Sequence, residues 1–184
     1  SKRAVKNILL TFGGGDDKGV IRFVLNNLIE YLSVEKKIKI ISGLSNPNNS
    51  NIKKWIKKNG FGKVELKINP ENVPEIISNC DLAIINGGMT SYEVAYVGLP
   101  MIIITTAENQ KKNAKAWVKK GSAVYAGSYD NLSKKKLIDS FNNLVNSSKI
   151  RSSQCISSKK ITKGFGSDNV ASKLIELKQV KEEF

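Results

Sequence analysis

Short apolar segments along the chain alternate with longer segments whose apolar residues recur at helical spacing. Six of the short segments are rich in β-branched residues, which is typical of buried strands. We therefore predict strands at 7–12, 37–43, 63–68, 81–86, 100–105 and 122–127. Helices are predicted between them, at 18–33, 50–60, 90–97, 109–120 and 132–146. We also expect Asn72 to cap a short helix whose early turn carries Pro74.

The end of the chain follows a different pattern. Residues 147–163 are polar and rich in serine, and we expect this segment to be irregular. Residues 167–184 are predicted to form a terminal helix, with Ser167 or Asp168 as its cap. Because no internal repeat or low-complexity tract marks a second unit, we expect one domain over residues 1–184.

Strand and helix alternate six times, which defines the α/β fold class. Continuous apolar strands indicate that helices cover both faces of the sheet, and right-handed crossovers then give a doubly wound, six-stranded parallel sheet of Rossmann-like type. Ligands of such sheets bind at the carboxyl ends of the strands. The loops expected to carry function are therefore 13–17, 43–49, 69–73, 86–90 and 106–109.

Net charge and residue usage narrow the function classes. The formal net charge is +14, but aromatic residues are not interleaved with the lysines as a nucleic-acid platform requires, so we expect no nucleic-acid partner. The chain has no histidine, which removes the commonest general base and the commonest zinc ligand. We expect no metal and no cofactor.

Cellular location is read from two further features. No apolar run approaches the roughly 20 residues that a bilayer crossing needs, so we expect no membrane span. Cys80 and Cys155 match no metal-site spacing and suggest no disulfide framework, which favours a reducing cytoplasmic location.

The first strand-to-helix turn reads GGGDDKG, with Gly13, Gly14 and Gly15 in series. It matches neither the dinucleotide fingerprint nor the P-loop, because the third glycine position is Lys18 and no Gly-Lys-Ser/Thr follows. One interpretation is that the glycines expose amides to a ligand. The other is a tight turn alone, with Asp16 or Asp17 capping the next helix.

The segment NGGMTSYE follows a buried strand and opens a helix. Gly87 and Gly88 carry no side chain, so an anion can approach the amides of residues 88–91, which include Met89. The helix dipole favours negative charge there. Thr90 and Ser91 are expected to add hydroxyl donors, which makes this turn a candidate diphosphate site.

Glu93 admits two interpretations. The sequence TSYE fits the capping box, in which the Glu93 carboxylate only bonds a backbone amide. Alternatively, the carboxylate accepts two hydrogen bonds from a sugar diol such as the ribose hydroxyls.

Two more turns offer polar groups. TTAENQKKNA places Glu108, Asn109 and Gln110 at the start of a helix, where Asn109 can act as N-cap or where the amide side chains can bind sugar hydroxyls. The loop INPENVPEI is stiffened by two prolines, and its backbone can either read the edge of a planar base or serve only as a rigid loop.

Together these motifs resemble the C-terminal domain of GT-B-fold nucleotide-sugar enzymes. The resemblance rests on ILLTFGGGD, IISGLSNPN, the segment from INPENVPEI to VGLPMIII, AENQKKNA and GFGSDNVASKLIEL, and covers nearly the whole chain. It looks closest to the UDP-sugar hydrolase of pseudaminic-acid biosynthesis and to spore-coat polysaccharide proteins, with the peptidoglycan N-acetylglucosaminyltransferase more distant.

The resemblance implies a UDP-sugar ligand. It would place uracil near the backbone of Asn72 and Val73, the diphosphate at residues 87–91, the ribose at Glu93 and the sugar at Asn109 and Gln110. It further implies a UDP-sugar hydrolase in nonulosonic acid or surface polysaccharide biosynthesis, or alternatively the donor-binding half of a glycosyltransferase. Because the family fold has two domains, we expect an N-terminal domain of the same enzyme as partner, no catalytic residue in this half, and no activity from it alone.

Overall fold

The structure is a computed structural model that describes residues 4–33, 35–60 and 62–182. Its six strands are β1 (Asn7–Thr11), β2 (Lys37–Ser42), β3 (Val64–Ile68), β4 (Leu82–Ile85), β5 (Met101–Thr105) and β6 (Ala123–Ser128). They form one parallel sheet in the order β3-β2-β1-β4-β5-β6. All six predicted strands are confirmed, within one or two residues at their ends.

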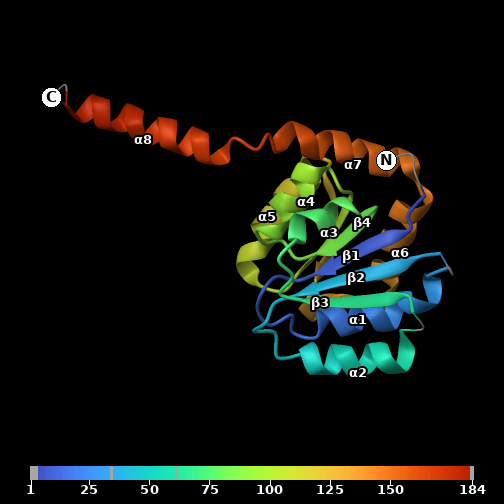
Figure 1. Cartoon of the computed structure of the whole chain (residues 1–184). Helices are drawn as coiled ribbons and strands as arrows, with labels where there is room; N and C mark the ends of the chain where they lie inside the picture. The colour runs from blue at the N-terminus through green and yellow to red at the C-terminus, as the bar shows by residue number, and fades with distance from the viewer. Residues whose placement is uncertain (1–3, 34, 61, 183–184) are drawn as a thin grey trace.

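Helices cover both faces of this sheet. They are α1 (Val20–Leu28), α2 (Asn49–Asn59), α3 (Val73–Ser78), α4 (Thr90–Val97), α5 (Glu108–Lys119) and α6 (Lys134–Asn146), with short 3-10 turns at Ile29–Tyr31 and Tyr129–Asn131. Apolar side chains of α1, α2 and α6 form one core cluster with the sheet, and those of α3, α4 and α5 form a second cluster on its other face. Figure 1 shows α1 and α2 on one side of the sheet and α3 and α4 on the other. The predicted doubly wound fold is confirmed.

The strand order places a switch point at β1. This strand pairs with β2 on one side and β4 on the other, so the connections leave in opposite directions from the middle of the sheet. A crevice opens outside the carboxyl ends of the strands at such a point. The loops that follow β1 and β4 border that crevice.

Residues 147–163 were expected to be irregular, and this expectation is wrong. They contain helix α7 (Ser148–Ile161), which Ser147 caps by accepting a hydrogen bond from the Ile150 N–H at 3.3 Å. Helix α7 packs against α4 and α6.

The buried face of α7 is polar, which explains why its sequence lacks apolar periodicity. Gln154 is 4% exposed, and its Oε1 accepts a hydrogen bond from the Met101 N–H at 3.0 Å. Arg151 is 3% exposed and donates to the Leu144 carbonyl oxygen at 2.7 Å. Side chain to backbone hydrogen bonds therefore fix this helix where apolar contacts usually would.

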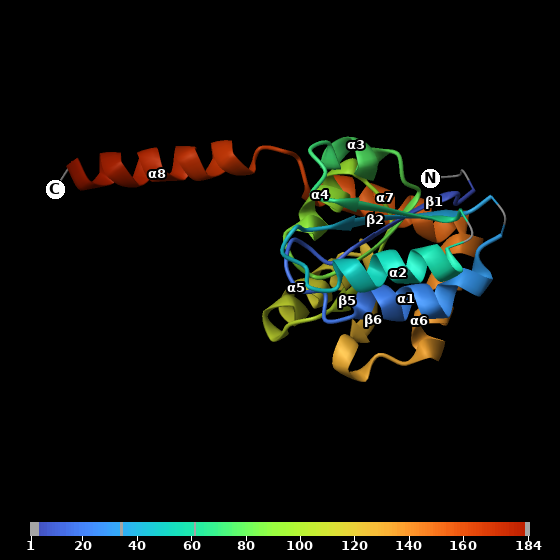
Figure 2. The same cartoon turned by 60° about the horizontal axis from the view of Figure 1, so that its bottom comes forward.

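The terminal helix α8 (Gly166–Glu182) begins one residue before the predicted start and extends away from the sheet and its covering helices (Figures 1 and 2). Its Val170, Leu174 and Ile175 are 60 to 63% exposed. No helix within the described part of the chain has the length and apolar character needed to cross a bilayer.

The two cysteines are expected to differ in reactivity. Cys80 is buried, and this burial raises the pKa of its thiol to about 11, whereas Cys155 is half-buried. Because the thiolate is the reactive form, we expect a thiol reagent at neutral pH to modify Cys155 rapidly and Cys80 only on unfolding. Mass spectrometry of wild type and Cys155→Ser after brief labelling tests this. Rapid modification of the Cys155→Ser variant would contradict the burial of Cys80.

Candidate functional site

A cavity of about 270 Å³ lies at the carboxyl ends of β1 and β2 and is bordered by α3 and α4. It is lined by Thr11, Gly13, Gly14, Ile41, Ser42, Gly43, Asn69, Pro70, Val73, Ile77, Thr90 and Glu93. These residues come from the ends of β1 and β2, from the loops after β1, β2 and β3, from α3 and from the first turn of α4. The cavity therefore occupies the crevice that the strand order defines.

The β1–α1 loop is held in place by its neighbours. Gly13 has a φ of +90°, a backbone angle that residues with a side chain rarely adopt. Gly14 touches Gly43 so closely that a Cβ on Gly43 would lie 1.9 Å from the Gly14 carbonyl oxygen. The first glycine-rich loop and the β2–α2 loop therefore form one packed wall of the cavity.

The two aspartates of this loop are bonded within the protein. Asp17 is 1% exposed and accepts a hydrogen bond from the Ile21 N–H at 2.9 Å, so it satisfies an amide in the first turn of α1 as predicted for a cap. Asn48 donates to both Asp16 and Asp17, at 3.0 and 2.8 Å. Neither aspartate lines the cavity.

The first turn of α4 offers unbonded amides. The N–H of Gly88 is bonded to the Asn86 side chain, and those of Ser91 and Tyr92 are bonded to backbone carbonyl oxygens. Among the described residues, no acceptor is bonded to the N–H of Met89 or Thr90. Such amides at a helix N-terminus favour an anion.

Ser91 was expected to donate its hydroxyl to a ligand, and the structure contradicts this. The side chain is fully buried, and its Oγ donates to the Gly88 carbonyl oxygen at 2.6 Å. The Ser91 Oγ also accepts hydrogen bonds from Trp117 Nε1 at 2.9 Å and from Asn113 Nδ2 at 3.2 Å. Ser91 therefore fixes the turn, whereas Thr90 lines the cavity.

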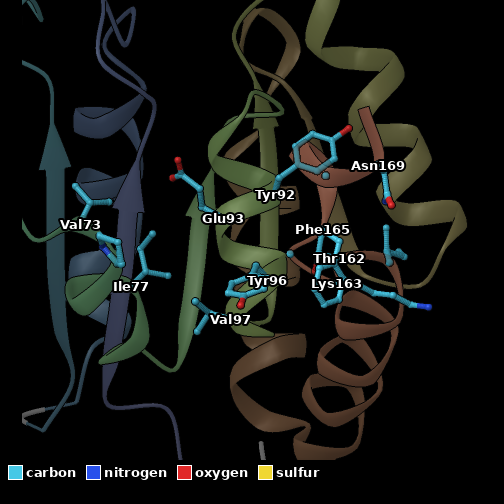
Figure 3. Close-up of a pocket in the computed structure, with 14 residues that line it drawn as sticks. Val73, Ile77, Tyr92, Glu93, Tyr96, Val97, Thr162, Lys163, Phe165 and Asn169 are labelled. Atoms are coloured by element: carbon cyan, nitrogen blue, oxygen red, sulfur yellow. The ribbon is translucent and has the colours of Figure 1, made fainter. Parts of the chain in front are cut away.

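The capping box predicted as one interpretation of Glu93 does not form. Helix α4 begins at Thr90 with Met89 in the cap position, and no side chain caps it. Glu93 is exposed, and none of the hydrogen bonds found among the described residues involves its carboxylate. In Figure 3, Glu93 lies on the side of α4 that faces Val73 and Ile77. Its carboxylate is thus free to accept hydrogen bonds from a ligand.

Glu93 also borders a second, larger cavity of about 770 Å³ between α3, α4 and the α7–α8 connection. Its walls are largely apolar and aromatic, with Tyr92, Tyr96 and Phe165 among the lining residues (Figure 3). Val73, Ile77 and Glu93 line both cavities. The two spaces therefore meet at the gap between α3 and α4.

The β5–α5 turn differs from its predicted form. Helix α5 begins at Glu108 with Ala107 in the cap position, so Asn109 lies inside the first turn and is not the N-cap. Gln110 Oε1 accepts a hydrogen bond from the Thr106 N–H at 2.9 Å, so this side chain ties the helix start back to the preceding loop. Glu108 pairs with Lys111, and this hydrogen bond raises the pKa of Lys111.

Asn72 precedes α3 as predicted, but its side chain does not cap the helix. Its Nδ2 donates instead to Glu75 Oε2 at 2.9 Å. Pro74 stands in the first turn as expected. Val73, the first residue of α3, lines both cavities.

The structure brings together only some of the predicted site residues. Gly13, Gly14, Val73, Thr90 and Glu93 line the smaller cavity. The others do not line it: Gly15, Asn72, Gly87, Gly88, Met89, Ser91, Glu108, Asn109 and Gln110. Gly43 and Asn69 also line the cavity, directly after strands β2 and β3. They lie in the loops 43–49 and 69–73 that were expected to carry function, although they were not named as individual site residues.

Fold and site together define a class. A six-stranded parallel sheet with the order 3-2-1-4-5-6 and a glycine-rich first loop is the arrangement of Rossmann-like domains. The described residues include no group of three His, Cys, Asp or Glu side chains that could hold a metal ion.

Comparison with known protein families assigns the chain to one of them. The model of the glycosyltransferase family 28 C-terminal domain matches residues 8–166, and the chain belongs to this family. Its Rossmann-like sheet is thus the C-terminal domain of a GT-B glycosyltransferase-like protein, as the sequence resemblance implied.

Two curated relatives are longer than this chain. The spore coat polysaccharide biosynthesis protein SpsG of Bacillus subtilis is 27% identical over 127 residues, which cover 68% of this chain and 37% of that protein. A UDP-N-acetylglucosamine--N-acetylmuramyl-(pentapeptide) pyrophosphoryl-undecaprenol N-acetylglucosamine transferase of Carboxydothermus hydrogenoformans is 30% identical over 122 residues, covering 64% of this chain and 33% of the enzyme. This chain therefore corresponds to about a third of either relative.

A solved structure shares the fold. TarM of S. aureus, determined in complex with Fondaparinux, alpha-GlcNAc-glycerol and UDP, superposes with a TM-score of 0.72 at 12% identity, over 94% of this chain and 35% of TarM.

Proposed function

We propose that this chain is the donor-binding half of a UDP-sugar glycosyltransferase. The observation that carries the proposal is the cavity at the switch point, where the glycine-rich β1–α1 loop, Thr90 with its open amide and the unpaired carboxylate of Glu93 meet. The family assignment and the UDP-dependent relative support it.

In the proposed complex, each part of UDP has its own chemistry. Uracil lies against the backbone of Asn72 and Val73, and the ribose hydroxyls donate to Glu93. The diphosphate accepts hydrogen bonds from amides of the β1–α1 loop and of Met89 and Thr90, where the helix dipole adds favourable charge. A carboxylate near the diphosphate is tolerated because it faces neutral hydroxyls one unit away.

The sugar is proposed to lie beyond the diphosphate, toward the β5–α5 turn. Asn109 is exposed there, and Gln110 retains its amide NH₂ as a donor because only its oxygen is bonded to Thr106. Neutral amide groups suit sugar hydroxyls, which both donate and accept.

In the proposed reaction, this half of the enzyme binds and stabilises the leaving group, which is UDP. When the bond between the sugar and UDP breaks, negative charge builds up on the diphosphate. Fixed amides at the start of α4 would stabilise that charge. The acceptor and any general base would come from the other half, consistent with the absence of histidine here.

The alternative is a UDP-sugar hydrolase, in which water replaces the acceptor. The resemblance in the sequence favoured this enzyme, but the curated relatives reported above are a transferase and a spore-coat polysaccharide biosynthesis protein. The full-length enzyme incubated with UDP-sugar separates the two. We expect UDP release to depend on an added acceptor, whereas equal release without acceptor would favour the hydrolase.

The second half of the enzyme is the proposed partner. Helix α8 extends away from the sheet (Figure 2), and its Val170, Leu174 and Ile175 are exposed. The relative from Bacillus subtilis is long enough to contain another domain. We further propose that the enzyme works in the cytoplasm, where two unpaired thiols are stable.

Binding of UDP by the 184-residue chain tests the proposal. We expect a dissociation constant of about 0.1–1 mM, because only one half of the enzyme contributes contacts. Calorimetry is run at about 0.15 M salt to screen the net positive charge, with inorganic pyrophosphate as the control ligand. If pyrophosphate bound as tightly as UDP, the interaction would be only an attraction between opposite charges, and the proposal would be overturned.

A further inference from the structure

Asn86 connects the two glycine-rich loops. It lies at the carboxyl end of β4 and is 8% exposed. Its Nδ2 donates a hydrogen bond to the Phe12 carbonyl oxygen at 2.8 Å, and its Oδ1 accepts one from the Gly88 N–H at 3.1 Å. One amide side chain thus bonds the residue before Gly13 and the second glycine of the β4–α4 loop.

Both loops pack closely against this side chain. A Cβ on Gly88 would lie 3.1 Å from Asn86 Oδ1, and a Cβ on Gly13 would lie 3.5 Å from Asn86 Nδ2. The missing side chain of Gly88 therefore eases its close approach to the buried amide, whereas the distance at Gly13 is ordinary van der Waals contact.

The bonding also decides which amides stay open to a ligand. Because Asn86 occupies the N–H of Gly88, the unbonded donors of this turn are those of Met89 and Thr90. Asn86 itself does not line the cavity, so any effect on a ligand passes through the loops.

We propose that Asn86 is a positioning residue that sets the β1–α1 loop and the first turn of α4 as one diphosphate site. This inference rests on the proposed function. A diphosphate bonded to both loops requires their amides at a fixed separation, whereas a nucleoside needs only Glu93 and the β3–α3 loop. Loss of Asn86 therefore weakens UDP binding selectively.

The test compares UDP with uridine. Affinities are measured by NMR titration, which reaches millimolar dissociation constants, on wild type and on Asn86→Ala. We expect the variant to bind UDP about tenfold more weakly and uridine within about twofold of wild type, since it loses ordered charge-assisted bonds to phosphate only. Asn86→Ser carries the same expectation if the alanine variant does not fold, because a hydroxyl is too short to bond both partners.

Gln154→Ala is the matched control. This amide side chain is as buried as Asn86 and also bonds a backbone group. That group lies at the start of β5, at the amino ends of the strands, whereas Asn86 lies at their carboxyl ends. We expect it to lower the melting temperature without changing the UDP to uridine affinity ratio.

The outcomes separate the two claims. Equal weakening of UDP and uridine by Asn86→Ala, or unchanged UDP binding, would show an ordinary structural asparagine and overturn this inference alone. A wild-type chain that binds UDP no better than uridine would overturn the proposed function itself.

Discussion

Replacing Glu93 by glutamine is expected to weaken UDP binding about 10- to 100-fold with little loss of stability. The carboxylate is exposed and is bonded to no described residue, so folding does not depend on it. In the proposed complex it accepts hydrogen bonds from both ribose hydroxyls. Hydrogen bonds to a charged group contribute about 1.5–3 kcal/mol, which corresponds to this range of affinity.

A second nucleotide makes this test specific. The 2′-deoxy analogue of UDP lacks one of the two hydroxyls. Wild type should therefore bind UDP more tightly than this analogue, whereas Glu93→Gln should show no such preference. Glu30→Gln is the control, because it removes the same charge from an exposed position that lines neither cavity. Unchanged UDP affinity in Glu93→Gln would show that the free carboxylate is not a ribose ligand.

Replacing Gly43 by alanine is expected to disrupt the cavity wall and destabilise the fold. The added Cβ would meet three backbone atoms of Gly14, the nearest at 1.9 Å, and backbone cannot rotate away as a side chain can. Overpacking of this kind costs about 1–3 kcal/mol, or about 3–10 °C in melting temperature for a chain of this size. Since Gly14 and Gly43 both line the cavity, UDP affinity should fall as well.

Gly166→Ala is the matched change for comparison. It adds the same methyl group where no atom lies within 4 Å and where φ is not positive. Thermal unfolding followed by circular dichroism should distinguish the two variants clearly. A Gly43→Ala protein as stable as wild type would mean that the two loops do not make the close contact on which the cavity depends.

Much of the fold could be predicted because the sheet is buried on both faces. Strands such as Met101–Thr105 are continuous apolar runs that read differently from the amphipathic helices around them. Helix α7 escaped prediction because its inward residues are Arg151 and Gln154, which satisfy backbone groups instead of filling apolar space. Apolar periodicity carries no signal for such a helix.

The candidate site could be predicted as a set of loops but not as a set of side chains. Strand ends indicated where the glycine-rich loops would meet. The sequence could not tell that Ser91 is bonded inward to Trp117, or that α5 begins at Glu108 with Gln110 bonded back to Thr106. Each of these depends on a contact between elements distant in sequence or on a shift of one or two residues in a helix start.

The central claim is that UDP binds between the first glycine-rich loop and the start of α4. A ¹H–¹⁵N NMR titration of the chain with UDP tests it most directly. The account predicts that the largest amide shift changes occur at Gly13, Gly14, Met89, Thr90 and Glu93. Changes confined to lysine-rich helices such as α2, or to the aromatic cavity beside α7, would contradict it.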